Sequence, residues 1–319
     1  MTEINPWIWA GFVVCIVFFI ALDLGAFSRK TRATGIRSAL VWSGIWMSLA
    51  LLFAAGLFEW RGRAEATQFI TGYLIELSLS LDNILVMALI FAAFHVPLAL
   101  QHRALLWGIL GAIVLRGTMI GLGSVLIQQF NWMLYVFGGF LVLAGIKTAL
   151  TRRPVALEPE TNSFLRLLRR WLPVSDNFDG DKFLTLAGGR RALTPLALVL
   201  VLVESGDLIF ALDSVPAVFS VTRSAFIVFT SNVLALIGLR SLYFVLAGAL
   251  DYFRYLKFGL ALVLVFVGAK MLLELHGPQA LWFQQVIPNG VCLMVIAGIL
   301  AGAMTFSVIA ARRERGVHS

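Results

Sequence analysis

Acidic side chains recur inside two of the most apolar stretches of this sequence. The first stretch, LIELSLSLDNILV, places Glu76 and Asp82 six residues apart. The second, VESGDLIFALDSVPAVF, contains Glu204, Asp207 and Asp213, and its last two acids are again six residues apart. A carboxylate at the centre of a membrane helix costs about 2.5–3.5 kcal/mol on insertion scales. Five such groups need compensation, and the chemistry that compensates a carboxylate is a cation or a proton.

Two arginines supply part of that compensation. Arg116 and Arg240 lie well inside apolar stretches, and we interpret them as structural counter-ions of the acids. Lys147 and Lys270 lie near the ends of apolar stretches, where a lysine side chain can extend toward the headgroups. Two arginines cannot neutralise five carboxylates, so a bound cation or protonation is expected to do the rest.

Helical geometry limits how these acids can bind an ion. A separation of six residues places two side chains about 120° apart and about 9 Å along the helix axis. Two such carboxylates cannot both bind one metal ion at 2.0–2.6 Å. Either acids from the two stretches meet, or a helix breaks. The second stretch has the means to break, because Gly206 is flexible and Pro216 removes the donor to the Leu212 carbonyl.

The candidate metal ligands are all oxygen donors. They are Glu76, Asp82, Glu204, Asp207 and Asp213, with Asn83, Ser205, Ser214 and Asn232 as further neutral oxygens unless these bond neighbouring helices. The four histidines fall at span ends or in the tail, and the two cysteines, Cys15 and Cys292, are isolated. Oxygen sites suit Mg²⁺, Ca²⁺ or Mn²⁺ better than copper or zinc, and they would repel an anion such as tellurite. No nucleophile–base pair, haem ligand or nucleotide loop is present, so we expect no enzyme activity and no catalytic or cofactor-binding residues.

The elements that position these residues are predicted to be membrane helices. Of the 319 residues, 60% are hydrophobic and 13% are charged, against about 45–50% and about 25% in a soluble domain. A spanning helix needs about 20 mostly apolar residues. The fold class is therefore an all-α polytopic membrane protein, with nine predicted spans at 7–27, 39–58, 69–94, 105–126, 132–150, 195–217, 226–249, 256–275 and 287–311.

Basic residues predict the orientation of these spans. They gather after the first, third, fifth, seventh and ninth spans, whereas the alternate connections carry only Arg61, Arg63 and Arg223. We therefore expect the N-terminus outside and the C-terminus in the cytoplasm of a multi-pass inner-membrane protein. The net charge of +8 then reflects topology, and no nucleic-acid partner is expected. The first apolar segment lacks a basic n-region, which favours a retained span over a cleaved signal peptide.

The long connection 151–194 is too polar to span the membrane. Residues 164–172 alternate apolar and basic side chains at helical spacing, which indicates an interfacial helix on anionic lipid. Gly188 and Gly189 sit between two short predicted strands, which indicates a hairpin. Asp176, Asp179 and Asp181 lack the spacing of a calcium loop, so we interpret them as a turn.

Spans three to five resemble spans six to eight. The match is carried by SLDN and ALDS, by GAIVLRG and LALIGLRS, and by LAGIKTAL and FVGAKMLL, so that Asp82, Arg116 and Lys147 correspond to Asp213, Arg240 and Lys270. Because each unit has three spans, the second must enter the membrane from the opposite side, which is an inverted-topology repeat. The predicted organisation is two N-terminal helices (1–68), the first repeat (69–150), the cytoplasmic loop (151–194), the second repeat (195–275) and a last helix with a basic tail (276–319).

With these motifs in place, the chain resembles the TerC/Alx family of integral membrane proteins. The resemblance rests on GYLIELSLSLDN, LVLVESGDLIFALDSVPAVFSVT, TSNVLALIGLRSLYF and LKFGLALVLVFVGAKML, and it covers nearly the whole chain. The family is named for tellurium resistance, and its Alx branch is implicated in manganese homeostasis. The resemblance implies metal binding by the same five acids and Mn²⁺ as the metal.

The function expected from these observations is export of Mn²⁺ by alternating access of the two repeats, in exchange for protons or another cation. Mn²⁺ is then the substrate, other hard divalent cations are possible, and the remaining partner is the lipid bilayer. Two alternatives stay open. The chain could be a membrane scaffold that assists insertion or assembly of other membrane proteins, or a tellurite-resistance factor that transports nothing itself.

Overall fold

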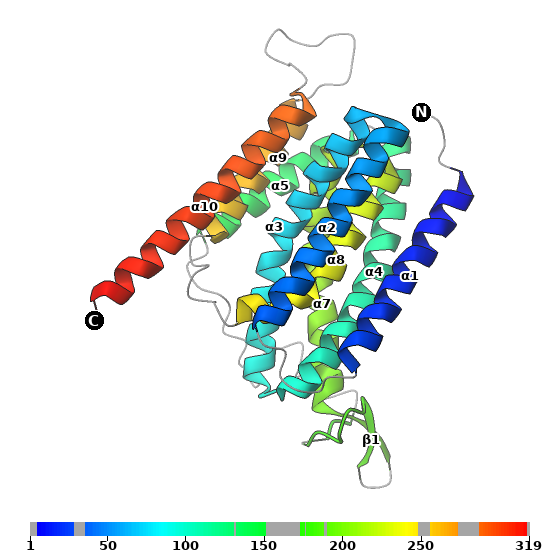
Figure 1. Cartoon of the computed structure of the whole chain (residues 1–319), viewed down its shortest axis with the longest axis vertical. Helices are drawn as coiled ribbons and strands as arrows, with labels where there is room; N and C mark the ends of the chain where they lie inside the picture. Colours follow the sequence, from blue (N-terminus) through cyan, green and yellow to red (C-terminus); the bar gives the residue numbers. More distant parts are fainter. Residues whose placement is uncertain are drawn as a thin grey trace.

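The computed structural model describes residues 5–28, 36–130, 132–150, 173–175, 177–187, 190–247, 256–273 and 287–317. Over these residues the chain forms a bundle of long α-helices with one small β-hairpin (Figure 1). The amphipathic segment predicted at 164–172 lies outside the described residues, and so do Asp176 and the glycines of the hairpin turn.

A helix occupies most or all of each of the nine predicted spans. In the part of the chain that the structure describes, these are α1 (Pro6–Ser28), α2 (Ile36–Arg61), α3 (Arg63–Ala93), α4 (Leu98–Gln129), α5 (Met133–Leu150), α7 (Pro195–Phe219), α8 (Ala225–Ala247), α9 (Leu256–Leu273) and α10 (Asn289–Val317). Seven of them are long and apolar enough to cross a membrane over their described residues, whereas α1 and α9 do not meet that criterion there. The multi-pass helical class is confirmed.

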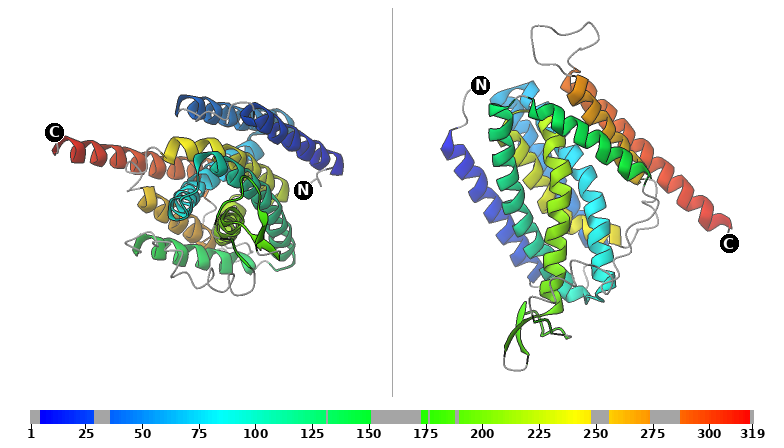
Figure 2. Two further views of the ribbon diagram at one scale, coloured as in Figure 1. Left: turned by 90° about the horizontal axis from the view of Figure 1, so that it is seen from below. Right: turned by 180° about the vertical axis from the view of Figure 1, so that it is seen from behind.

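Four helices form the centre of the bundle. α3, α4, α7 and α8 pack on one another, with α1 and α2 on one side and α5 and α9 on the other (Figure 2). α10 packs on α3 and α9, and its C-terminal half projects away from the bundle (Figure 1). The buried residues of these central helices include most of the polar side chains singled out in the sequence.

The helices α3 and α4 are longer than the predicted spans. They contain 31 and 32 residues, which corresponds to about 46–48 Å at 1.5 Å per residue and exceeds a hydrocarbon core of about 30 Å. Their ends therefore extend into the headgroup region. Only Gly62 separates α2 from α3, and its φ of 89° is a conformation that glycine adopts without a Cβ clash.

α5 and α9 approach each other closely at glycines. A Cβ added to Gly268 would lie 2.7 Å from the Gly138 carbonyl oxygen, and one added to Gly145 would lie 2.8 Å from the Ala261 carbonyl oxygen. The contacts run in opposite directions along the two helices, so α5 and α9 cross as an antiparallel pair. Small residues at a helix crossing let backbones approach in the membrane, where packing replaces the hydrophobic driving force.

The helix break considered for the second acidic stretch is absent from α7. The helix is continuous from Pro195 to Phe219, and Pro216 lies inside it. Pro216 falls in the last turn, where the ladder has almost ended, so the bond it removes does not interrupt the helix at the acids. The Thr194 side chain caps the N-terminus of α7 by accepting a hydrogen bond from the Ala197 backbone N–H at 3.4 Å.

The predicted hairpin is present. Strands β1 (Leu184–Ala187) and β2 (Arg190–Leu193) pair antiparallel, and the predicted turn before them contains Gly180 at a φ of 54°. The hairpin docks on α4, because Arg103 forms an ion pair with Asp181 and the rings of Trp107 and Phe183 lie 6.1 Å apart.

Candidate cation site

Arg116 lies at the centre of the bundle and is 1% exposed. Its Nη2 donates to Oδ1 of Asp207 at 2.9 Å, and its Nε donates to Oδ2 of the same carboxylate at 3.2 Å. The third nitrogen, Nη1, forms an ion pair with Oε1 of Glu76. One guanidinium on α4 therefore joins an acid of the first stretch, on α3, to an acid of the second, on α7.

Neutral side chains complete this arrangement. Nη1 of Arg116 also donates to Oγ of Ser214 at 3.0 Å and to Oδ1 of Asn232 at 3.0 Å. Nδ2 of Asn83 donates to Oδ1 of Asp207 at 3.0 Å. We refer to the six residues Glu76, Asn83, Arg116, Asp207, Ser214 and Asn232 as the Arg116 cluster; all of them are buried.

Helical periodicity explains how four elements deliver these side chains to one place. Glu76 and Asn83 are seven residues apart on α3, and Asp207 and Ser214 are seven apart on α7, so each pair shares one helix face. Asn232 comes from α8, and its Nδ2 donates to the Val228 carbonyl at 3.2 Å. That bond turns the amide oxygen of Asn232 toward Arg116.

The charges of the Arg116 cluster do not balance. With both acids ionised, two carboxylates share one guanidinium and the net charge is −1. Glu76 is 0% exposed, and its Oε2 has no hydrogen-bond partner among the described residues. An uncompensated buried charge and an unsatisfied carboxylate oxygen are both costly. The cluster as described therefore retains capacity for a further positive charge.

The spacing of the acids allowed either a meeting of acids from the two stretches or a break in a helix, and the structure shows the first. Glu76 and Asp207 meet across α3 and α7, around Arg116 and not by direct contact. Asp82 and Asp213 are half-buried, and the charges acting on them belong to Lys257 and Lys147 respectively.

Two other predicted ligands also lie outside the Arg116 cluster. The Glu204 carboxylate packs against α4 at Gly111, where an added Cβ would overlap its atoms. Ser205 donates its Oγ proton to the Val201 carbonyl of its own helix at 2.7 Å. Among the described residues, no three His, Cys, Asp or Glu side chains lie close enough to hold a metal ion. The five acids thus do not form one all-carboxylate centre.

The remaining basic residues occupy different environments. Arg240 is buried on α8, where its charge acts on His102. The expectation that Lys270 extends toward the headgroups is wrong, because its side chain is 3% exposed and its Nζ donates to the Ser220 carbonyl at 2.9 Å. Ser220 caps the C-terminus of α7, and a cation there interacts favourably with the helix dipole.

Some buried polar residues near the cluster were not predicted. Thr230 and Ser231 precede Asn232 on α8 and are fully buried. Ser78 and Ser80 are buried on α3, and their hydroxyls have no hydrogen-bond partner in the part of the chain that the structure describes. The run of three polar residues at 230–232 inside an apolar stretch was the available signal for α8.

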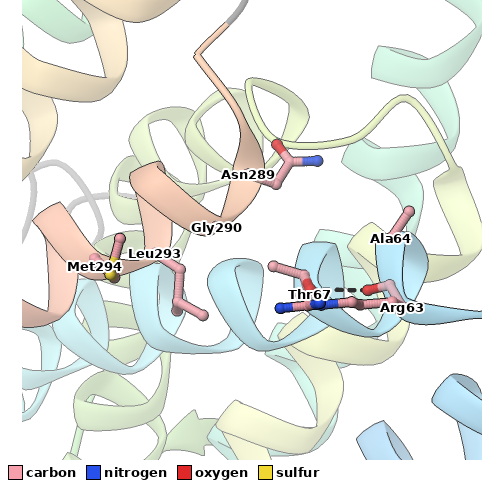
Figure 3. A pocket seen from close by; sticks show the side chains of 7 residues that line it. All are labelled: Arg63, Ala64, Thr67, Asn289, Gly290, Leu293 and Met294. Carbon is pink, nitrogen blue, oxygen red and sulfur yellow. Dashed lines mark hydrogen bonds between the residues drawn. The ribbon is translucent and has the colours of Figure 1, made fainter.

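An open groove between α3 and α10 is separate from this site (Figure 3). The Thr67 hydroxyl donates to the Arg63 carbonyl there at 2.8 Å. The groove is lined by Arg63, Ala64, Thr67, Asn289, Gly290, Leu293 and Met294. This lining contains no acidic side chain, so the groove is no candidate for binding a cation.

Comparison with known proteins gives consistent matches over nearly the whole chain. The model of the integral membrane protein TerC family matches residues 61–315. An uncharacterized membrane protein of Myxococcus xanthus is 48% identical over 308 residues, which cover 97% of this chain and 94% of that protein. A protein of Escherichia coli K12 named "Putative membrane-bound redox modulator Alx" is 45% identical over 319 residues, covering 95% and 94% of the two chains. No solved structure matches.

Proposed function

The chain belongs to the TerC family of integral membrane proteins, and on that premise we propose that it transports a divalent metal cation, Mn²⁺, across the membrane. The observation that carries the proposal is the Arg116 cluster. Two fully buried carboxylates from different helices share a single guanidinium, which leaves a net charge of −1 when both acids are ionised. Buried ionisable groups inside membrane helices mark ion pathways and proton relays, because their burial is otherwise costly.

The donor set supports a hard cation as the substrate. The cluster offers carboxylate, amide and hydroxyl oxygens, and such oxygens suit Mn²⁺, Mg²⁺ and Ca²⁺. Two carboxylates would neutralise one divalent ion. The choice of Mn²⁺ among these ions comes from the family resemblance.

We further propose that α3–α5 and α7–α9 form the two inverted repeats of a carrier. The α5–α9 crossing supports this. When Lys147 is aligned with Lys270, Gly138 corresponds to Ala261 and Gly145 to Gly268. Gly138 contacts Gly268, while Gly145 contacts Ala261.

Each of these contacts is therefore the exchanged counterpart of the other, as in an interface with two-fold symmetry. The central helices pair in the same way, α3 with α8 and α4 with α7. A pseudo-two-fold axis in the membrane plane is the arrangement that alternating access uses in inverted-repeat transporters.

In this proposal the protein lies in the inner membrane with its hairpin in the cytoplasm, and it moves Mn²⁺ outward. The Arg116 cluster forms the central part of the pathway, and Asp82, Glu204 and Asp213 lie along the routes to it.

A thiol–disulfide reaction gains no support as an alternative, because Cys15 is exposed on α1, Cys292 is buried on α10 and no disulfide joins them.

The proposal is tested by Mn²⁺ uptake into inverted vesicles that contain the overexpressed protein. We expect Glu76→Gln and Asp207→Asn to abolish uptake, because each removes one of the two buried carboxylates. Asp181→Asn is the matched control, since it removes an acid from the exposed hairpin and should transport like the parent. Equal uptake by all three variants and the parent would contradict the site.

The same assay decides the roles of the outlying acids. If Asp82→Asn and Asp213→Asn transport at the parent rate, these two residues are not metal ligands and do not belong to the pathway. A parent protein that moves no Mn²⁺ while still supporting assembly of other membrane proteins would favour the scaffold alternative.

A further inference from the structure

We propose that Arg116 is a tethered competitor of the transported cation. Its guanidinium occupies the cation site of the empty carrier, and it must withdraw from Glu76 and Asp207 before a metal ion can bind there. The inference rests on the proposed function and deepens it, since it assigns to one residue the control of metal affinity at that site.

The first observation is an excess of acceptors around one nitrogen. Nη1 of a guanidinium carries two hydrogens. Three oxygens nevertheless lie within hydrogen-bond distance of Nη1 of Arg116, one each from Glu76, Ser214 and Asn232. A nitrogen with two protons cannot donate a full bond to three acceptors. A shell of converging oxygens is, however, the environment of a hard metal ion.

The second observation is that two of the acceptor side chains, Asn232 and Asp207, are oriented by hydrogen bonds that do not involve Arg116. The Asn232 amide is oriented by its own bond to the Val228 carbonyl, and the Asp207 carboxylate is held by Asn83. With Oδ1 and Oδ2 of Asp207, the shell comprises five oxygens, which come from α3, α7 and α8, while the guanidinium alone comes from α4. Removal of the Arg116 side chain would therefore leave the oxygens of Asn232 and Asp207 oriented toward the space that the guanidinium occupied.

The third observation is the charge of the cluster. With both acids ionised and the guanidinium in place the buried net charge is −1, whereas a divalent ion in place of the guanidinium makes the charge zero. Oε2 of Glu76, which has no hydrogen-bond partner among the described residues, would then be available as a further ligand. The metal ion and the guanidinium cannot both occupy the site, because two cations only a few ångströms apart in a buried environment repel each other strongly.

The exchange has a mechanistic consequence. When no metal is present, Arg116 neutralises one carboxylate and hydrogen-bonds the other. The empty site therefore does not bury two uncompensated negative charges. The measured affinity for metal is then the intrinsic affinity of the oxygen shell, reduced by the fraction of carriers in which Arg116 is withdrawn.

The test measures binding of Mn²⁺ alone to the purified full-length protein, by the loss of the electron paramagnetic resonance signal of aqueous Mn²⁺. We expect Arg116→Gln to bind Mn²⁺ at least ~10-fold more tightly than the parent. Arg103→Gln is the matched control, because it removes an arginine that pairs with Asp181 on the surface, and its Kd should equal that of the parent. A Kd for Arg116→Gln equal to or weaker than the parent's would overturn the proposal.

Arg116→Gln also leaves two buried carboxylates without a cation, so it is purified in Mn²⁺ and its folding is checked by size exclusion. If it does not fold, Arg116→Lys carries the test. A lysine keeps the charge but cannot bridge both carboxylates. The Mn²⁺ affinity of Arg116→Lys should therefore be higher than that of the parent and lower than the affinity expected for Arg116→Gln. Affinity no tighter than the parent's would overturn the proposal.

Chemical rescue separates competition from a general structural effect. In Arg116→Ala, free guanidinium ion at millimolar concentration should compete with Mn²⁺ and raise its apparent Kd toward the parent value, whereas the parent should not respond. Insensitivity of the alanine variant to guanidinium would contradict the proposal.

Failure of the inference and failure of the proposed function are distinguishable. If the parent binds and transports Mn²⁺ but Arg116→Gln binds no more tightly, only the competitor role is wrong. If neither the parent nor Arg116→Gln binds Mn²⁺ in a manner that depends on Glu76 and Asp207, both proposals fail.

Discussion

At the scale of single residues, the most informative feature is the unequal bonding of the two acids around Arg116. Asp207 uses both oxygens toward Arg116 and also accepts from Asn83. Glu76 uses one oxygen and leaves the other without a hydrogen-bond partner among the described residues. Replacing a buried ion cluster by apolar side chains is often neutral or stabilising. Stability alone therefore does not account for this cluster, which fits a role in binding.

This asymmetry predicts the order of two stability effects. Asp207→Asn should lower stability by about 2–3 kcal/mol more than Glu76→Gln, because it replaces an oxygen of a bidentate pair by an amide nitrogen that faces another donor. Glu76→Gln removes the excess negative charge, so its midpoint should stay close to that of the parent. The measurement is the thermal unfolding midpoint of each purified variant in one detergent without added metal. Equal midpoints for the two variants would contradict this account of the cluster.

At the scale of elements, the α5–α9 crossing depends on the absence of side chains. A Cβ at Gly268 would approach the Gly138 carbonyl oxygen to 2.7 Å and the Val142 backbone nitrogen to 2.8 Å. Both are backbone atoms and cannot rotate away, so the helices would have to separate. Gly139, on the same pair of helices, has nothing within 4 Å of an added Cβ.

Two alanine substitutions should therefore have effects of opposite sign. Gly268→Ala should destabilise the protein by about 1–3 kcal/mol through overpacking. Gly139→Ala should stabilise it by about 0.5–1 kcal/mol, because alanine loses less backbone entropy in a helix. Thermal unfolding of the two variants beside the parent checks the prediction. A stabilised Gly268→Ala protein would show that α5 and α9 are not in this close contact.

The hairpin element carries a pH-dependent contact. The Asp179 carboxylate accepts a hydrogen bond from Oγ1 of Thr185 at 2.9 Å and lies 3.4 Å from Nζ of Lys182. The Thr185 hydroxyl, and then Lys182, lower the pKa of Asp179 below its ordinary value of 3.8. Because the pKa is lowered on folding, the contact stabilises the hairpin above pH 3.8 and is lost as the pH falls through the folded pKa.

Removing the hydroxyl should reverse that shift in part. Thr185→Val is expected to raise the pKa of Asp179 toward its ordinary value, measured by NMR titration of labelled Asp carboxyl carbons in the full-length protein. Leu186→Ala changes an exposed neighbour on the same strand and should leave the titration of Asp179 as it is. An unchanged pKa in Thr185→Val would mean that the hydroxyl does not hold the carboxylate.

At the scale of the whole molecule, the proposed orientation places the hairpin in the cytoplasm and the start of α3 outside. The hairpin and the start of α3 lie at opposite ends of the bundle (Figure 1). α3 begins at Arg63 and runs toward the end of the bundle where α4 contacts the hairpin. Leu186 on the hairpin and Arg63 on α3 are both exposed.

Cysteine labelling tests this orientation. In a background with Cys15 and Cys292 replaced by serine, Leu186→Cys should react with a membrane-impermeant maleimide only in inverted vesicles. Arg63→Cys should react only in intact cells whose outer membrane has been permeabilised. Labelling in the reverse pattern would show that the chain is inserted the other way round, and the proposed direction of transport would have to change with it.

Several features followed from the sequence alone because they depend on local composition and on the cost of burial. A run of apolar residues long enough to cross a membrane must form a helix, so each predicted span contains a helix over its described residues. A carboxylate or arginine inside such a run must find partners, which is why Glu76, Arg116 and Asp207 could be singled out in advance. Asn83, Ser214 and Asn232 could be singled out as neutral oxygen donors in such apolar stretches.

What only the tertiary structure decided is which of these groups meet. The sequence contains five acids and two arginines, but the rotation and crossing of packed helices determine that Arg116 joins Glu76 to Asp207 and that Asp82 and Asp213 stand apart. The same packing turns Lys270 inward onto the end of α7. These pairings join residues far apart along the chain, and local periodicity states only the face of a helix on which a side chain lies, not the helix that the face meets.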